Sequence, residues 1–250
     1  MGFGRIRSMR WVWLIVALLL SVGARAAEPL SIYCERWQGF CEPDGRGFYF
    51  DLVRAVYEPR GYQVVARLTP YKRAVKLVVE GEADMTIGVY PNEVNGVVWP
   101  TLSAFADDVS VLMTKERLAA WQGEQSLRGK RVVWQRGWAY DKYIPVTMFW
   151  HEVDSHQMAL QLLEKGRYDY YLGAGVLFRE QSLPAGMEWR LLRWLPTYPV
   201  FVASTRGEQL ARLWDEGLRR LYRDGTLQAL YRRHALSDYF DYYRQASRQP

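Results

Sequence analysis

The segment from Gly47 to Tyr90 constrains the fold of this chain more than any other. It reads as a helix, a strand, a helix and a strand in succession. The apolar residues of the first expected helix (50–57) lie on one side, and the sequence YQVVARL at 62–68 is rich in β-forming side chains. Strands that alternate with helices are typical of a parallel sheet with helical crossovers. The segment therefore predicts an α/β fold.

Capping and turn residues mark the boundaries inside this segment. Thr69-Pro70 provides an N-cap and a proline in the first turn of a second helix, expected over 71–80, which Gly81 ends. A short strand of the buried type is expected over 84–89. These boundaries favour two complete strand-and-helix units in this part of the chain.

A looser version of the same pattern follows. The element EGEADMTIG at 80–88 resembles KGRYDYYLG at 165–173, since both place an aspartate before an apolar strand. Two similar α/β units suggest two lobes, with a small ligand between them beyond the carboxyl ends of the strands. Further strands are expected over 108–113, 130–135, 189–195 and 199–203, and helices from about Tyr140 and over 155–165.

The clearest helical pattern lies near the C-terminus. Apolar residues from Leu210 to Tyr222 recur at spacings of three and four. Asp224-Gly225 interrupts the pattern, and a further helix is expected over 226–234. The aromatic tail from Ser237 shows no clear period, and we expect it to pack back on the surface.

Residues 1–26 have the composition of an export signal. Three arginines precede the apolar run from Trp11 to Val22, which is too short to span a membrane comfortably, and Ala24-Arg25-Ala26 fits a cleavage site. We expect cleavage after Ala26 and a periplasmic protein of 224 residues, the full 250 less 26. An uncleaved membrane anchor is the alternative.

The charge balance argues against nucleic acid as a partner. The net charge is +6, but four of the 33 lysines and arginines lie in the export signal, which leaves 29 against 27 acidic residues. No basic run is interleaved with aromatics in the way that nucleic-acid binding requires. An aromatic content of 15% suits a ligand cleft as well as a large core.

The two cysteines, Cys34 and Cys41, occur in the sequence CERWQGFC. An oxidising compartment favours a disulfide that closes this short loop. Free thiols and a metal site are the alternatives, and the metal site is disfavoured because no further cysteine or histidine lies nearby. The three histidines show no ligand spacing either, so we expect no metal and no cofactor.

Five segments in order resemble the family 3 extracellular solute-binding proteins. They lie at 45–56, 70–88, 127–140, 165–173 and 207–234. Members of that family have the type 2 periplasmic binding protein fold and serve ABC importers for polar amino acids. The resemblance implies two Rossmann-like α/β lobes joined by a two-strand hinge, and lobes that close on a bound ligand.

The resemblance also implies the division of the chain. Lobe 1 would be discontinuous and comprise 27–113 and 200–250, and lobe 2 would comprise 114–199. The hinge strands would lie near Thr114 and at 198–202. We expect a monomer.

Two positions depart from the family pattern. Val94 or Asn95 stands where amino acid binders carry the arginine that pairs with the ligand carboxylate. Ala174-Gly175 stands where they carry the aspartate that holds the ligand ammonium. An arginine clamp is not replaced by an uncharged residue without loss of the charge. We therefore expect a small polar or aromatic ligand other than a standard α-amino acid held by the usual pair.

Four candidate ligand contacts lie in the first part of lobe 1. The resemblance places Trp37 and Phe40 over the ligand, in the loop that the cysteines would fix, and Tyr71 at the cleft wall. Arg73, near a helix start, could meet an anionic ligand. The alternatives are cover or core packing for the aromatics and solvent exposure for Arg73.

Four further candidates follow. Gly88 and Tyr90 end a strand and would present backbone groups to the cleft. Arg136 and Trp138 lie in a strand-to-helix turn, where free N–H groups suit an anion. Asp169 is interpreted as a structural turn residue.

The function that these features favour is a periplasmic solute-binding protein without chemistry of its own. Its partners would be a small ligand and a membrane permease or sensor. One alternative is an enzyme on the same scaffold, of the cyclohexadienyl dehydratase type, for which Glu93 is the acid nearest the expected cleft. Another is a sensing module for a membrane kinase or cyclase.

Overall fold

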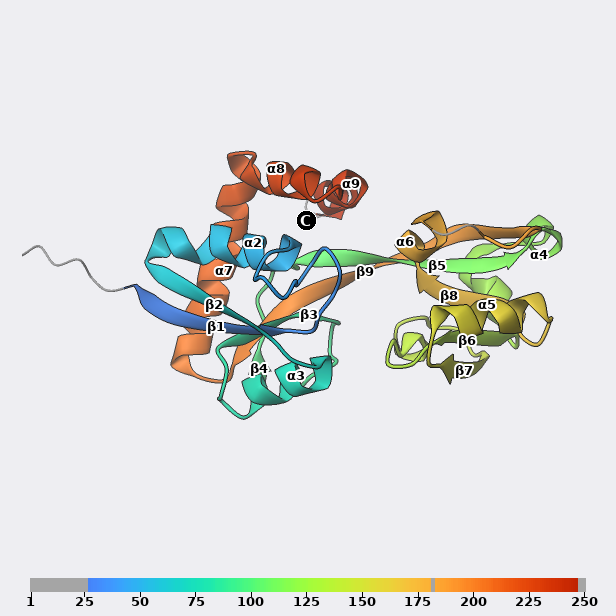
Figure 1. The fold of residues 1–250 in the computed structure, drawn as a ribbon, viewed down its shortest axis with the longest axis horizontal. Coiled ribbons are helices and arrows are strands. Elements are labelled where there is room, and N and C mark those ends of the chain that lie inside the picture. The colour runs from blue at the N-terminus through green and yellow to red at the C-terminus, as the bar shows by residue number, and fades with distance from the viewer. Residues whose placement is uncertain (1–26, 181–182, 247–250) are drawn as a thin grey trace, which may run out of the picture.

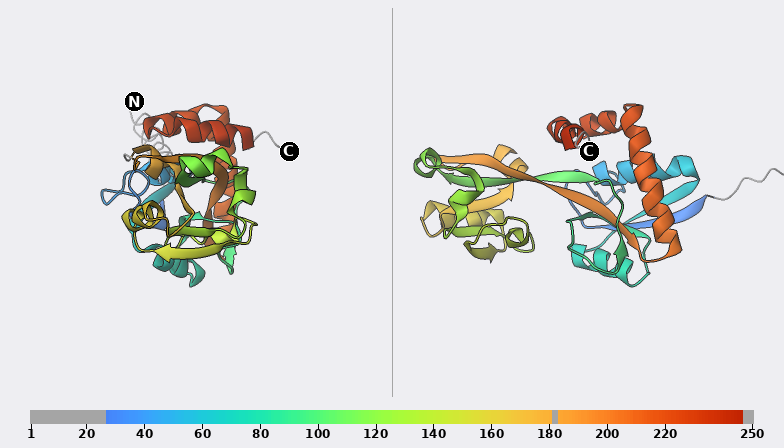
Figure 2. Two further views of the ribbon diagram at one scale, coloured as in Figure 1. Left: turned by 90° about the vertical axis from the view of Figure 1, so that its right-hand side faces the viewer. Right: turned by 180° about the vertical axis from the view of Figure 1, so that it is seen from behind.

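The computed structural model describes residues 27–180 and 183–246. The predicted export signal lies outside these residues. Two lobes lie side by side along the long axis of the molecule, and a two-stranded ribbon joins them (Figures 1 and 2). Among the described residues, no helix is long and apolar enough to cross a membrane.

Lobe 1 is built on a sheet of strands in the order β2, β1, β3 and the second half of β9, with β4 beside β9. β1 is parallel to both β2 and β3, as the alternating pattern predicts. The helix, strand, helix and strand predicted for the Gly47–Tyr90 segment are confirmed as α2 (Phe48–Tyr57), β2 (Tyr62–Leu68), α3 (Tyr71–Val79) and β3 (Met85–Val89). β1 (Glu28–Cys34) precedes this segment and β4 (Val97–Val98) follows it.

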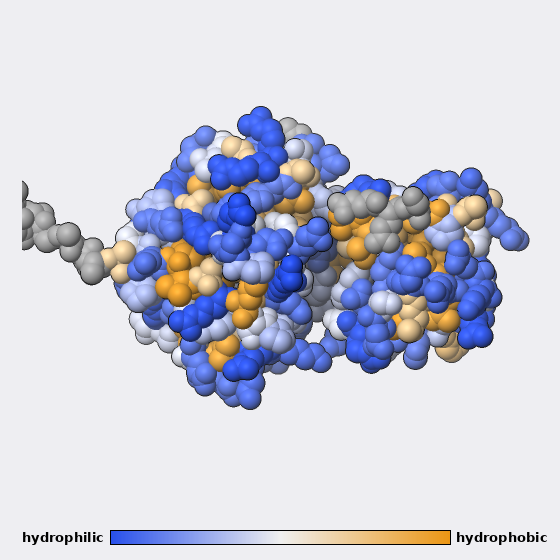
Figure 3. All heavy atoms as spheres, viewed as in Figure 1, coloured by the Kyte–Doolittle hydropathy of each residue, from blue (hydrophilic) through white to orange (hydrophobic). Residues whose placement is uncertain are grey.

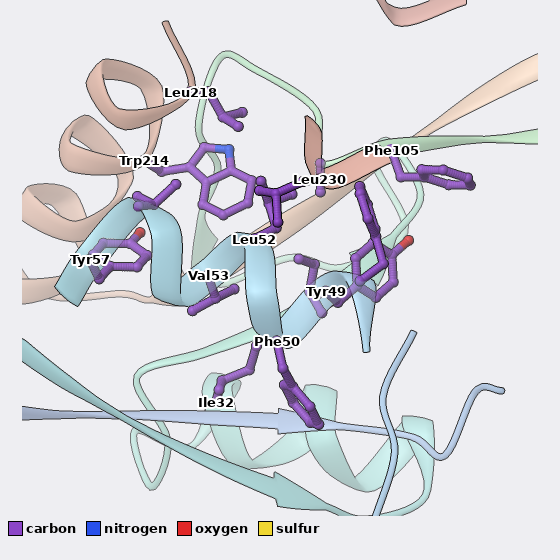
Figure 4. Packing of buried hydrophobic residues seen from close by; sticks show 14 of the residues in the cluster. Ile32, Tyr49, Phe50, Leu52, Val53, Tyr57, Phe105, Trp214, Leu218 and Leu230 are labelled. Atoms are coloured by element: carbon purple, nitrogen blue, oxygen red, sulfur yellow. The ribbon is translucent and has the colours of Figure 1, made fainter. Parts of the chain in front are cut away.

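The core of lobe 1 packs α2 between the sheet and the long helix α7 (Thr205–Arg223) (Figure 4). Tyr57 and Trp214 are fully buried where α2 meets α7. Their polar atoms are satisfied, because the Tyr57 hydroxyl donates to the Leu210 carbonyl at 2.8 Å and the Trp214 indole to the Leu102 carbonyl at 2.9 Å. Burial of aromatic side chains therefore leaves no orphaned donor at this contact.

The ribbon consists of β5 (Phe105–Thr114) and β9 (Met187–Val202), which pair antiparallel from Phe105 opposite Thr197 to Thr114 opposite Met187. The prediction of two separate strands over 189–195 and 199–203 is wrong, because β9 is continuous. Pro196 lies within it, before β3 joins at Tyr198. A proline is tolerated at this position because β9 pairs there with β5 on one side and with no described strand on the other.

Lobe 2 extends the ribbon in the order β9, β5, β8, β6 and β7. The helix predicted from about Tyr140 is wrong: a single 3-10 turn, Tyr140–Lys142, stands there, after Ala139 with a φ of 47° and before Pro145. β7 and α6 were not predicted. The elements are α4 (Lys115–Ala119), β6 (Arg131–Gln135), β7 (Phe149–Val153), α5 (His156–Glu164), β8 (Tyr170–Ala174) and α6 (Gly175–Glu180).

Asp169 has a structural role in lobe 2. It accepts the Arg131 backbone N–H at 2.8 Å and pairs with Arg117 at 2.5 Å. Burial opposes its charge, but the bonds from Arg131 and the charge of Arg117 hold its pKa below the usual range. The carboxylate thus ties the start of β6 to α4.

The residues at which the lobes divide stay a prediction. Phe105 packs in the core of lobe 1, whereas Val109–Leu112 pair with β8 of lobe 2. The chain therefore passes from one lobe to the other within β5, between Phe105 and Val109.

Three helices close the described chain: α7, α8 (Thr226–Arg233) and α9 (Ser237–Ala246). The tail forms a helix that the aromatic spacing did not reveal. Tyr239 stacks on Phe105 at 4.8 Å and Tyr242 on Trp194 at 4.6 Å, so α9 lies against both strands of the ribbon (Figure 1). The C-terminal helix therefore packs on the hinge.

The predicted disulfide between Cys34 and Cys41 is confirmed. Both residues are buried at the end of β1. The bridge closes a loop that holds Trp37, whose carbonyl accepts the N–H groups of Phe40 and Cys41. The loop is thus fixed at both ends and by its own backbone.

Replacing both cysteines (C34S together with C41S) is expected to lower the free energy of unfolding by about 2–3 kcal/mol, because the bridge closes a loop with a sequence separation of 7. Urea unfolding followed by tryptophan fluorescence measures the change. Reduced wild-type protein is the control and is expected to match the double variant. Equal stability of oxidised and variant protein would contradict the expectation.

Candidate ligand-binding site

The candidate site lies where the carboxyl ends of β1 and β3 meet the ribbon. These two strands are parallel neighbours, so the loops that follow Cys34 and Val89 leave the sheet at the same edge. The surface is hollowed there, between the two lobes (Figure 3). Side chains from lobe 1, the ribbon and lobe 2 converge on this edge.

Trp37 forms one wall of the site and lies directly over Gly88. A β-carbon at Gly88 would come within 2.6 Å of the Trp37 ring, and Gly88 has a φ of +86°, which side chains rarely adopt. The indole also faces Tyr71, at 5.8 Å between ring centroids, and Tyr49, at 6.2 Å. A glycine at position 88 is therefore what lets the aromatic wall approach the strand.

Tyr90 connects lobe 1 to the ribbon and to lobe 2. Its hydroxyl donates to the Asp107 carboxylate on β5 at 2.5 Å, and its ring lies 5.0 Å from that of Tyr143 in lobe 2. Its backbone N–H donates to the Glu93 carboxylate at 3.0 Å. The two carboxylates thus lie at opposite ends of one tyrosine.

Glu93 lies between the lobes on an exposed turn. Burial and the nearby Glu93 carboxylate both raise the pKa of Tyr71 well above its usual value. The same two causes raise the pKa of Tyr143 to about 12. One carboxylate therefore acts on tyrosines from both lobes, and both tyrosines stay neutral at ordinary pH.

Asp107 has the most perturbed carboxyl group of the site. Burial raises its pKa to about 6, and the adjacent Asp108 adds to the shift, while the bond from Tyr90 opposes it. Among residues 27–180 and 183–246, no lysine, arginine or histidine forms an ion pair with Asp107. Its charge is therefore not balanced within the described protein.

Asp108 has the opposite environment, because successive residues of a strand point to opposite faces. It pairs with Arg179 of α6 at 2.8 Å and accepts the Gly175 N–H at 3.0 Å. Arg179 also donates to the Tyr239 hydroxyl of α9 at 2.6 Å. On one face of the ribbon the Asp108 carboxylate is paired with Arg179. On the other face, toward the hollow, the Asp107 carboxylate has no ion-pair partner among the described residues.

The structure brings four of the predicted contacts together. Trp37, Tyr71, Gly88 and Tyr90 lie around the convergence described above. We call the set that lines it the interlobe site, and it comprises Trp37, Tyr71, Gly88, Tyr90, Glu93, Asp107 and Tyr143. Tyr49 lies behind Trp37 and is buried in the core of lobe 1.

The other four predicted contacts do not join this set in the structure. Phe40 packs among Phe48, Tyr49 and Phe105 in the core of lobe 1. Arg136 pairs with Asp154 at 2.8 Å on an exposed surface. Arg73 is exposed and, among the described residues, pairs with no carboxylate, and Trp138 packs beside Tyr140 against the core of lobe 2.

Sequence reasoning missed Asp107 and Tyr143. A signal for Asp107 was present, since two adjacent aspartates interrupt the apolar strand FADDVSVLM and a buried carboxylate in such a run demands a partner. Tyr143 gave none, because nothing local distinguishes a tyrosine that faces a cleft from one in a core.

No metal or cofactor site emerges from the described residues, which hold no group of three or more potential metal ligands. Two surface depressions lie elsewhere on the described surface. One borders the disulfide loop at Glu42, Asp44, Arg46 and His234, where Arg46 pairs with Asp44 and His234 with Asp51. The other lies in lobe 2 between Asp141 and Trp150. Neither gathers side chains from both lobes, so the interlobe site stays the candidate.

The substitution Gly88→Ala is expected to displace the Trp37 ring and to lower the free energy of unfolding by about 1–3 kcal/mol, because the new methyl group meets the indole and the backbone is left-handed. Gly96→Ala is the matched control, since Gly96 has a φ of +74° and open space around it. Urea unfolding and near-ultraviolet circular dichroism measure both. Equal effects of the two substitutions would contradict the close packing of Trp37.

The substitution Asp107→Asn is expected to stabilise the unliganded protein at pH 7.5, by up to about 3 kcal/mol, since one pKa unit corresponds to about 1.4 kcal/mol. A folded-state pKa raised to about 6 means that the wild-type protein loses stability as pH rises from about 4 to about 6. The gap between variant and wild type should therefore widen over that window and then stay constant. A gap independent of pH, measured by urea unfolding, would contradict the raised pKa.

Comparison with known proteins supports the fold. No family model matches the sequence, and no curated protein sequence matches it. Solved structures do match, each at low identity.

Three of these structures are informative. The first is a probable amino-acid ABC transporter extracellular-binding protein from Bacillus subtilis, with 15% identity, a TM-score of 0.64, and coverage of 85% of this chain and 100% of that one. The second is a histidine kinase sensor domain with similarity to periplasmic binding proteins, with 18% identity, a TM-score of 0.63, and coverage of 83% and 96%.

The third is an ancestral amino acid-binding protein described as a precursor of cyclohexadienyl dehydratase, with 16% identity, a TM-score of 0.59, and coverage of 82% of this chain and 94% of that one. At these identities the likeness establishes the fold. The predicted fold class is confirmed: the chain has the two-lobed α/β fold of the type 2 periplasmic binding proteins.

Proposed function

We propose that this protein is a periplasmic solute-binding protein that captures a small molecule at the interlobe site. The observation that carries the proposal is the convergence of one tryptophan, several tyrosines and two carboxylates from both lobes and the ribbon on one hollow. A concave site with a few convergent polar groups is where small ligands bind.

The structural neighbours support a role in capture and delivery. One is named as an extracellular-binding protein of a transporter and another as the sensor domain of a histidine kinase. Residues 1–26 fit export to the compartment in which both kinds of protein work. We therefore propose that the ligand-bound protein, as a monomer, is read by a membrane permease or a membrane sensor.

Trp37, Tyr71, Gly88 and Tyr90 are the proposed lobe 1 contacts. Tyrosine and tryptophan offer flat apolar faces together with polar edges, which suits a small polar or aromatic ligand. The disulfide loop holds Trp37 in place before the ligand arrives, so less conformational entropy is lost on binding.

Binding would close the lobes by bending of the ribbon. Lobe 1 comprises 27–113 and 200–250 in this proposal, and lobe 2 comprises 114–199. Within residues 27–180 and 183–246, only the β5 and β9 backbones cross between the lobes, so closure needs small changes in a few residues of each strand. Tyr143 in lobe 2 would then cover a ligand that lies against Trp37 and Tyr71.

One observation favours an enzyme as the second candidate. Asp107 faces the site with a pKa of about 6, which suits a general acid or base near neutral pH. One structural neighbour is described as a precursor of a dehydratase. Recovery of the bound compound separates the two functions, since a binding protein returns it unchanged.

The test is a thermal-shift screen of residues 27–250 against amino acids, carboxylates, amines, sugars and aromatic acids. A compound that binds only the folded protein raises the melting temperature by mass action. The same compound should reduce the radius of gyration in small-angle X-ray scattering as the lobes close.

Trp37→Ala should remove the shift produced by such a compound. Trp150→Ala is the matched control, because Trp150 is half exposed on the edge strand of lobe 2 and stacks on Trp134, which is outside the interlobe site. A compound that shifts both variants equally binds elsewhere and would count against the proposed site.

A further inference from the structure

We propose that the interlobe site selects a small organic cation, an alkylammonium or guanidinium compound without a carboxylate. This inference rests on the proposed function and names the chemical class of its ligand. It is argued from the two carboxylates and the aromatic rings that the site holds.

The charge of the site is negative. Asp107 and Glu93 both face it, at the hydroxyl and the backbone ends of Tyr90. On the lobe 2 side Arg193 donates to the Tyr143 carbonyl at 2.5 Å, and its guanidinium is already paired with Glu124 at 2.5 Å. A bound cation would therefore balance a charge that the described protein leaves unbalanced.

The aromatic rings suit the same ligand. The faces of tryptophan and tyrosine attract cations within about 6 Å of the ring centre. Two ring pairs supply such faces next to the carboxylates, Trp37 with Tyr71 in lobe 1 and Tyr90 with Tyr143 across the hollow. Aromatic rings beside acids recognise an ammonium group better than a neutral group of equal size.

A carboxylate on the ligand would find no partner in this arrangement. The two arginines that the sequence suggested for an anion, Arg73 and Arg136, lie outside the set, and Arg136 is paired with Asp154. Val94 and Asn95 supply no positive charge. An anionic group placed beside Asp107 or Glu93 would instead be repelled.

Binding should depend on pH through Asp107. The titratable groups that face it are Tyr90, Tyr49, Tyr140 and the neighbouring Asp108. The tyrosines have raised pKa values, so they do not change charge between pH 5 and pH 8. Since a cation prefers the ionised carboxylate, affinity should fall about tenfold from pH 7.5 to pH 5, as Asp107 takes up a proton.

The experiment is isothermal titration calorimetry of residues 27–250 with pairs of compounds that share shape and differ in charge. The cations are choline, putrescine and agmatine. The neutral partners of the first two are 3,3-dimethylbutan-1-ol and 1,4-butanediol, and glutarate, L-glutamate and L-arginine complete the set. At least one cation should bind at least ten times more tightly than its neutral partner or, for agmatine, than L-arginine.

Two variants test the assignment of the charge. Asp107→Asn keeps an acceptor for Tyr90 and should weaken cation binding at least about thirty-fold, because a buried charge partner is lost. Glu93→Gln should weaken it less, since Glu93 is exposed. Glu82→Gln is the matched control, an exposed acid beyond the far end of α3, and should leave the affinity unchanged.

The outcomes separate the inference from the proposed function. Equal binding of a cation and its neutral partner, tighter binding of an anion, or cation binding that Asp107→Asn leaves intact would overturn the inference while the binding function stands. Failure of every cation to bind at 1 mM would also overturn it. If in addition no compound of any class closed the lobes in scattering, the proposed function would fail as well.

Discussion

The antiparallel pairing of β5 and β9 is the interaction on which the rest of the structure depends. It runs from Phe105 opposite Thr197 to Thr114 opposite Met187, with one shift of register between Val109 and Ser110, and it belongs to the sheets of both lobes. A ladder of backbone hydrogen bonds resists shear along the strands but permits bending and twist. The lobes are therefore joined by an element that fixes their register and leaves their separation adjustable.

This constraint also sets the position of the interlobe site. The parallel strands β1 and β3 end beside the ribbon, so the loops that follow them must gather next to Asp107. The disulfide and Gly88 then hold Trp37 against β3, and Tyr90 reaches across to the ribbon. Each of these contacts forms between nearby residues, and the order of strands in the sheet brings the contacts together at one site.

Much of the fold could be predicted because local signals agreed with it. Pro70 and Gly81 bound α3, and the apolar spacing from Leu210 onward describes α7. Prediction failed where tertiary contacts decide the structure. Pro196 reads as a break but lies in a ribbon with a free edge, and the aromatic tail becomes a helix because Phe105 and Trp194 accept its rings.

The site was harder to predict than the fold for a related reason. The resemblance implied the place of Trp37 and Tyr71, and that of Tyr90 was readable because it follows a strand end. Arginines drew attention as ligand contacts because they are charged, whereas the acid that faces the hollow was hidden in an apolar strand. What distinguishes Asp107 is the lack of a cation in the described structure around it, and a sequence does not display that.

The adjacent carboxylates Asp107 and Asp108 have a consequence for how ligand and hinge communicate. They lie on opposite faces of one strand. Asp107 faces the hollow, and the next residue, Asp108, pairs with Arg179, which also donates to Tyr239 of α9. The charge of Asp108 raises the pKa of Asp107. A positive ligand beside Asp107 would change the electrostatic field at Asp108 and Arg179, so the charge of the ligand would act on the ion pair that contacts α9 at the hinge.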